Sequence, residues 1–104
     1  MRFLFPRAKF ASTATIEAQS ASIINEANEV WWLDDEPLMH RDGHVLHPAD
    51  PPERFVEETL DCIHSCETLI RMLTDQYPHL DLDAAVENVR LKNEKRGYYE
   101  GEED

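Results

Sequence analysis

Residues 16–32, IEAQSASIINEANEVWW, carry the clearest helical pattern of the chain. Apolar or small side chains return there every three or four residues, at Ile16, Ser20, Ile23, Ala27 and Val30. This is the period of an α-helix that buries one face. We therefore predict a helix from residue 12 or 13 to residue 33.

Two carboxylates lie beside the apolar face of this predicted helix. Glu26 and Glu29 are three residues apart, so they project on the same flank, one turn from each other. A similar pair, Glu58 and Asp61, recurs downstream. If the two helices pack antiparallel through their apolar faces, the four carboxylates converge at one edge of the core.

Two further helices are predicted in the second half of the chain. One starts after Pro51 and Pro52, because proline suits a first helical turn, and runs to about residue 77. The other starts at Asp81 or Asp83 as its N-cap and runs to about residue 95, with Gly97 as its stop. Residues 34–52 read as a long loop, and residues 100–104 as a frayed acidic tail.

The last predicted helix carries an unusual polar continuation of its apolar face. We expect Leu82, Ala85, Val86 and Val89 to be its buried residues. The same stripe then continues into residues 92, 93 and 96, which are lysine, asparagine and arginine. Lysine and arginine bind phosphate well, although basic residues at a helix C-terminus are also favoured by the helix dipole alone.

Composition narrows the class of protein. The chain has 104 residues, 41% hydrophobic and 31% charged, which predicts a single soluble domain over 1–104. Its net charge of −12 repels nucleic acid, so we expect no nucleic-acid partner. No apolar run approaches the roughly 20 residues that span a bilayer. We therefore expect a cytoplasmic protein without a membrane partner.

The carboxylate pairs have two interpretations. Like charges at close range are costly unless a cation lies between them, and Mg²⁺ prefers oxygen ligands. In the other interpretation the acids are ordinary solvated flank residues, since a chain with 22 acidic residues contains such pairs by chance.

Taken in order, these segments carry a family resemblance. The ExxE of residues 26–29, the EETLD of residues 57–61 and the KNEKRGYY of residues 92–99 resemble the motifs of the MazG-like all-α nucleoside triphosphate pyrophosphohydrolases. The resemblance spans residues 13–99. It implies an all-α, MazG-like helical bundle with three main helices per chain, completed by oligomerisation as a homodimer or homotetramer.

The resemblance also implies an activity and its residues. The activity is Mg²⁺-dependent hydrolysis of a nucleoside or deoxynucleoside triphosphate to the monophosphate and pyrophosphate, with Mn²⁺ as a possible substitute. The implied catalytic residues, which position or deprotonate the attacking water, are Glu29 and Glu26. The implied metal ligands are Glu26, Glu29, Glu58 and Asp61. The implied substrate-binding residues are Lys92, Asn93, Arg96 and Tyr98. The alternative is a non-catalytic acidic helical interaction or regulatory protein that retains the fold.

Three other groups of residues have simpler predicted roles. Cys62 and Cys66 read as small core residues in a reducing compartment. The histidines of the loop, at 40, 44 and 47, have a spacing that suits a transition metal, but solvated loop histidines are the favoured interpretation. Trp31 falls on the core face, and Trp32 on the opposite side, where we favour a subunit contact over base stacking.

Overall fold

A computed structural model describes residues 1–30 and 51–100 of the chain. In these residues it contains a short 3₁₀ helix η1 (Lys9–Ser12) and three α-helices, α1 (Ile16–Val30), α2 (Pro52–Gln76) and α3 (Leu82–Lys95). No strand occurs in the described part of the chain. The prediction of an all-α fold with three main helices is therefore confirmed.

Local sequence signals account for the ends of α2 and α3. Helix α2 begins at Pro52, the expected first-turn proline, and ends one residue before Tyr77. The Asp81 side chain accepts a hydrogen bond from the backbone N–H of Ala84 at 3.1 Å, which makes it the N-cap of α3. Gly97 has a φ of 76°, the left-handed conformation that terminates a helix.

Helix α1 starts at Ile16, three or four residues later than predicted. Residues 9–12 form η1 instead, and the Thr13 that follows it leaves the helical conformation with a φ of −123°. The hydroxyl of Thr15 then accepts a hydrogen bond from the N–H of Ala18 at 3.0 Å and caps the new helix. The predicted helix end at residue 33 and most of the predicted loop lie outside the described residues.

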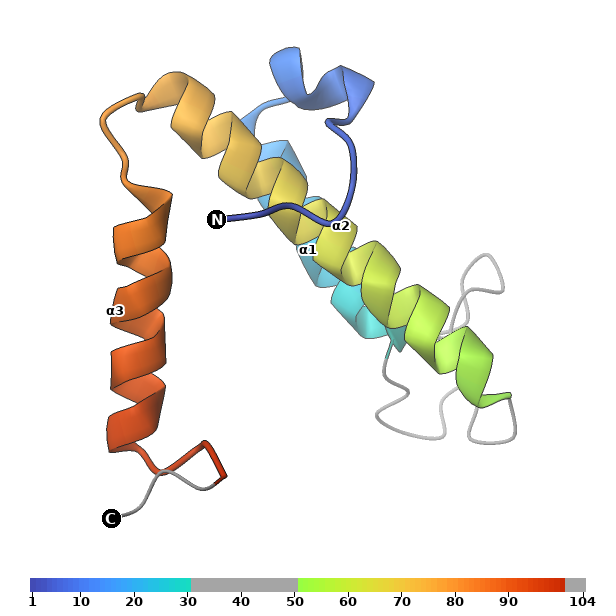
Figure 1. Ribbon diagram of the computed structural model, residues 1–104. Coiled ribbons are helices and arrows are strands. Elements are labelled where there is room, and N and C mark those ends of the chain that lie inside the picture. The colour runs from blue at the N-terminus through green and yellow to red at the C-terminus, as the bar shows by residue number, and fades with distance from the viewer. Residues whose placement is uncertain (31–50, 101–104) are drawn as a thin grey trace.

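Helices α1 and α2 pack antiparallel along much of their length (Figure 1). Gln19 of α1 is 3% exposed, and its side-chain amide donates a hydrogen bond to the backbone carbonyl of Ser65 at 2.9 Å. Such a bond between a buried amide and a backbone carbonyl fixes the register of the two helices. The register in turn decides which side chains of α1 and α2 face each other.

The first residues of the chain lie along the other side of α2. Glu67 is 6% exposed and accepts hydrogen bonds from the backbone N–H groups of Leu4, at 2.8 Å, and Phe5, at 3.1 Å. Arg71 donates to the carbonyl of Phe5 at 2.7 Å, and its guanidinium carbon lies 4.0 Å from the centre of the Phe3 ring. The Phe5 ring also lies 4.8 Å from the His64 ring, so both polar and ring contacts hold this N-terminal segment on α2.

Helix α3 diverges from the α1–α2 pair, so that the described chain forms an open arch (Figure 1). The close packing is between α1 and α2 and between α2 and η1. The predicted burial of the apolar face of α3 is therefore wrong for the single chain: Val86 and Val89 are each 50% exposed. The physical reason is that no helix of the described residues covers this face.

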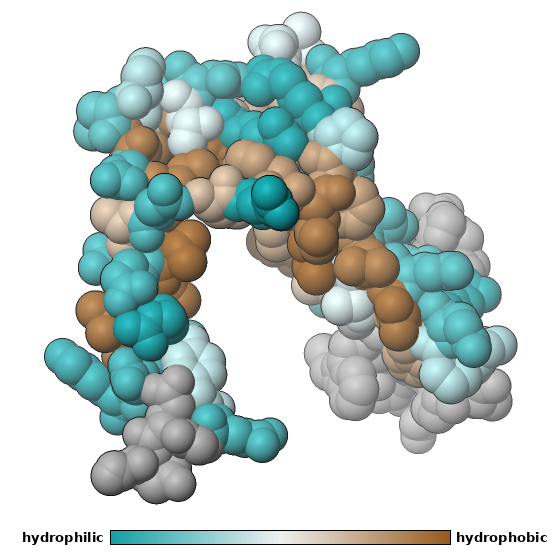
Figure 2. Space-filling model, in the orientation of Figure 1, coloured by the Kyte–Doolittle hydropathy of each residue, from teal (hydrophilic) through white to brown (hydrophobic). Residues whose placement is uncertain are grey.

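The core is correspondingly small. Among the described residues only Ala11 and Met72 are buried hydrophobic residues. Apolar side chains instead line both inner sides of the arch (Figure 2). A chain that buries so little apolar surface gains little stability from the hydrophobic effect.

None of the described helices is long and apolar enough to cross a membrane.

Candidate metal centre

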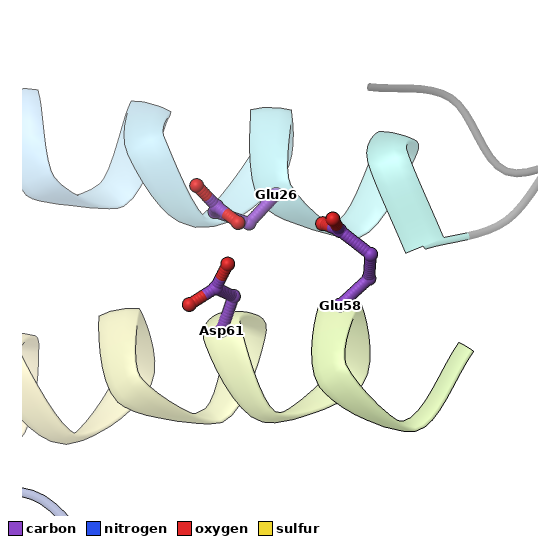
Figure 3. Close-up of side chains that lie close together, drawn as sticks. All are labelled: Glu26, Glu58 and Asp61. Atoms are coloured by element: carbon purple, nitrogen blue, oxygen red, sulfur yellow. The ribbon is translucent and has the colours of Figure 1, made fainter. Parts of the chain in front are cut away.

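Three carboxylates meet between α1 and α2. Glu26 projects from α1, and Glu58 and Asp61 project from α2 toward it (Figure 3). One carboxylate oxygen from each of the three residues lies within 4.8 Å of the other two. Glu26 and Glu58 are half-buried, whereas Asp61 is exposed. The cluster is thus open to solvent on one side.

Helix geometry explains this convergence. Glu58 and Asp61 are one turn apart on α2, so both side chains leave the same flank. The antiparallel packing of α1 brings Glu26 opposite them. The predicted meeting of the two acidic flanks is confirmed for these three residues. The side chain of Glu29, the fourth predicted ligand, lies outside the described part of the structure.

The donor set suits a hard divalent cation. Three carboxylates at this separation repel one another unless a cation neutralises them. Mg²⁺ and Ca²⁺ take oxygen ligands, and two ligands on opposite sides of such an ion are roughly 4 to 5 Å apart. The 4.8 Å spread of the cluster is therefore compatible with shared coordination. Exposed acidic groups also occur without a bound ion, so this geometry by itself identifies no ligand.

The predicted substrate-binding residues lie elsewhere. Lys92, Asn93, Arg96 and Tyr98 are at the C-terminal end of α3, on the other leg of the arch. The Arg96 guanidinium carbon lies 5.8 Å from the centre of the Tyr98 ring, and the Tyr98 N–H donates to the Asn93 carbonyl at 3.1 Å. These four residues form one polar helix end, but the single chain does not bring them to the carboxylates.

The cysteines lie next to the cluster. Cys62 follows Asp61 on α2, and both Cys62 and Cys66 are free thiols. Both were expected to be buried in the core, but in the structure they are only half-buried. Burial raises the pKa of the Cys62 thiol, and the neighbouring Cys66 and the carboxylate of Glu26 raise it further. At a given pH, less of Cys62 is therefore in the thiolate form than in an ordinary cysteine.

Glu67 and Arg71, which hold the N-terminal segment, have no role that the sequence predicts. The two residues are four apart on α2, a spacing that is typical of exposed ion pairs on a helix. Nothing in the local sequence indicates that Glu67 instead accepts two backbone N–H groups from residues more than 60 positions away. The predicted roles of Trp31, Trp32 and the histidines at 40, 44 and 47 fall outside the described residues.

Comparisons with known proteins assign neither a family nor a function to this chain. A scan against protein-family models, a search of curated proteins and a search of solved structures each gave no match. The resemblance noted from the motifs therefore stands on the residues of this chain alone.

Proposed function

We propose that this chain is a metal-dependent hydrolase that cleaves a nucleoside or deoxynucleoside triphosphate to the monophosphate and pyrophosphate. One observation carries the proposal: the carboxylates of Glu26, Glu58 and Asp61 meet between two antiparallel helices, in the order and spacing of the motifs that suggested the activity. In a protein of net charge −12, a triphosphate needs a cation to approach such a surface.

In this proposal the three carboxylates hold Mg²⁺, with Mn²⁺ as a substitute, and Glu29 belongs to the same site. A bound divalent cation neutralises phosphate charge and lowers the pKa of water. Glu26 and Glu58 are half-buried, so part of each side chain lies between the two helices. Either Glu26 or Glu29 would position the attacking water by accepting a hydrogen bond from it, or deprotonate it by accepting its proton.

The role of the polar end of α3 is the second part of the proposal. Lys92 and Arg96 are exposed cations, and a guanidinium can contact two phosphate oxygens at once. Because the single chain holds this end away from the carboxylates, it reaches a bound nucleotide only if α3 closes on the α1–α2 pair or a second copy supplies it. This requirement, together with the small core, supports a homodimer or homotetramer.

The test is phosphate release by the purified chain, over a panel of nucleoside and deoxynucleoside triphosphates with Mg²⁺. Phosphate should be detected only after inorganic pyrophosphatase is added, because the expected product is pyrophosphate. Asp61→Asn should abolish the signal, whereas Glu57→Gln, an exposed acid on the same helix outside the cluster, should leave it intact. No release from any nucleotide by the wild-type chain would refute the proposal.

The second candidate function is a non-catalytic interaction protein, and the exposed apolar face of α3 favours it. Exposed apolar patches mark sites where another protein binds. The two candidates differ in what they require of the acids. If the chain is an interaction protein, Asp61→Asn should not weaken the binding of its partner. The reason is that Asp61 lies on a different part of the molecule from this apolar face.

A further inference from the structure

The two cysteines of the chain, Cys62 and Cys66, both lie on one side of α2. Their spacing of four residues makes them neighbours one turn apart, with Cβ atoms about 5 to 6 Å from each other. Cys62 also comes four residues after Glu58, which places the pair on the side of α2 that faces α1. Two thiols are thus presented together beside the three carboxylates.

The surroundings of the thiols are negatively charged and partly open to solvent. Burial raises the pKa of the Cys62 thiol, and Cys66 and the carboxylate of Glu26 raise it further. Negative charges this close to one another oppose the formation of thiolates unless a cation is present. Both cysteines are only half-buried, so neither is sealed inside the core. A cation from solvent that replaces the thiol protons turns this repulsion into attraction.

The helical spacing suits a shared metal ion better than a disulfide. A disulfide needs Cβ atoms about 3.5 to 4.5 Å apart, so α2 would have to tighten by roughly 1 to 2 Å to form one. Two sulfurs that each bind one Zn²⁺ at about 2.3 Å lie roughly 3.8 Å apart in tetrahedral geometry, and their Cβ atoms can stay at the helical spacing. Thiolates select soft or borderline ions, whereas carboxylates suit Mg²⁺.

We propose that Cys62 and Cys66 together bind one thiophilic divalent cation, of the class of Zn²⁺ and Cd²⁺, on the side of α2 that faces α1. Each thiol gives its proton to solvent as its bond from sulfur to the metal forms, and nothing is oxidised or reduced. Water fills the remaining positions of the ion. The neighbouring carboxylates attract the cation without having to bind it. The chain would then carry a sulfur site for a soft ion next to an oxygen site for a hard one.

Cadmium is the probe, because a cadmium thiolate absorbs in the ultraviolet. Titration of the reduced chain with Cd²⁺ should develop this absorption up to one Cd²⁺ per chain, and excess Mg²⁺ should not remove it. Cys62→Ser and Cys66→Ser should each abolish the absorption at that ratio. Asp61→Asn changes the carboxylate cluster and leaves both thiols in place, so it should keep the absorption. Circular dichroism should show the same helix content in all four proteins.

Thiol protection tests the pairing on the wild-type chain alone. One equivalent of Cd²⁺ should protect both cysteines from alkylation by iodoacetamide, followed residue by residue by mass spectrometry, whereas excess Mg²⁺ should protect neither. Protection of only one cysteine, or absorption that survives either serine variant, would overturn the proposal.

Three further outcomes would also overturn it. They are the absence of cadmium binding, loss of the absorption in Asp61→Asn, and an end-point at half a Cd²⁺ per chain, which would mean that two chains share the ion. None of these measurements depends on hydrolysis of a nucleotide, so failure of the proposed function leaves this test unaffected.

Discussion

Glu26 of α1 and Asp61 of α2 hold carboxylate oxygens within 4.8 Å of each other across the helix pair. Helix packing alone does not favour this contact, because the two like charges repel. A divalent cation reverses the sign of the interaction. The same contact is therefore unfavourable without the cation and favourable with it, which makes it the most informative place to change one side chain.

The first prediction concerns cation binding. Isothermal titration with Mg²⁺ or Mn²⁺ should show binding to the wild-type chain, reduced about tenfold or more in Asp61→Asn, because an amide cannot replace the charge of a carboxylate ligand. Glu57→Gln removes the same charge from an exposed position nearby and should bind like wild type. Equal affinity in all three proteins would show that the acids are only solvated.

The Asp61→Asn variant also tests whether the three carboxylates repel one another in the absence of a cation. In EDTA, Asp61→Asn should have a melting temperature equal to or above that of wild type, because it removes one of three mutually repelling charges. In Mg²⁺ the order should reverse, because only the wild-type chain gains stability from the bound cation. A clear fall in melting temperature in EDTA would mean that Asp61 stabilises the fold directly.

The second prediction concerns the N-terminal segment. Glu67→Gln should destabilise the chain by about 1 to 3 kcal/mol, because one amide oxygen and an NH₂ group replace two carboxylate oxygens that accept from Leu4 and Phe5. For a domain of this size, that corresponds to a fall in melting temperature of several degrees. Glu57→Gln is again the control. An unchanged melting temperature would show that the segment contributes no stability.

The third prediction concerns the Cys62 thiol. Its pKa is raised, first by burial and then by Cys66 and Glu26, so less of it is thiolate near pH 9 than in an ordinary cysteine. Alkylation by iodoacetamide, followed residue by residue by mass spectrometry, should reach its half-maximal rate at higher pH in the folded chain than in urea.

The same shift has a consequence for stability. A thiol whose pKa is higher in the folded than in the unfolded chain contributes stability at pH values below its unfolded pKa, and this contribution is lost as the pH rises through the folded pKa. Cys62→Ser should therefore reduce the fall in melting temperature at alkaline pH. If Cys62 titrates identically in the folded and urea-unfolded chains, its pKa is not shifted by the fold.

The fourth prediction concerns the end of α3. Arg96→Ala should lower kcat/KM on the best triphosphate at least tenfold, because the guanidinium contacts phosphate oxygens in the proposed complex. Helix content and Mg²⁺ binding should not change, since the carboxylates are on α1 and α2. Lys95→Ala removes a neighbouring charge on another face and should have a small effect. Full activity of Arg96→Ala would remove this segment from the proposed site.

The sequence predicted the elements whose signals are local. Pro52 and Gly97 mark helix ends through their backbone conformation and Asp81 through its side chain, and each does so in the structure. The meeting of Glu26 with Glu58 and Asp61 was predictable because helix periodicity and antiparallel packing suffice to place them.

The features that were not predicted depend on contacts between distant residues. The polar binding of Leu4 and Phe5 by Glu67 has no periodic pattern, so no local signal indicates it. The exposure of Val89 has a different cause: its apolar spacing correctly predicts a face that packs, but periodicity does not tell whether the partner helix is in the same chain.

Identification of the products by ³¹P nuclear magnetic resonance is the sharpest test of the proposed hydrolysis. With Mg²⁺ and the best triphosphate of the panel, the wild-type chain should replace the three nucleotide resonances by those of the monophosphate and pyrophosphate. Neither EDTA-treated wild type nor Asp61→Asn should do so. An unchanged nucleotide spectrum with the wild-type chain, full turnover by Asp61→Asn, or release of a nucleoside diphosphate and phosphate would contradict the proposed activity.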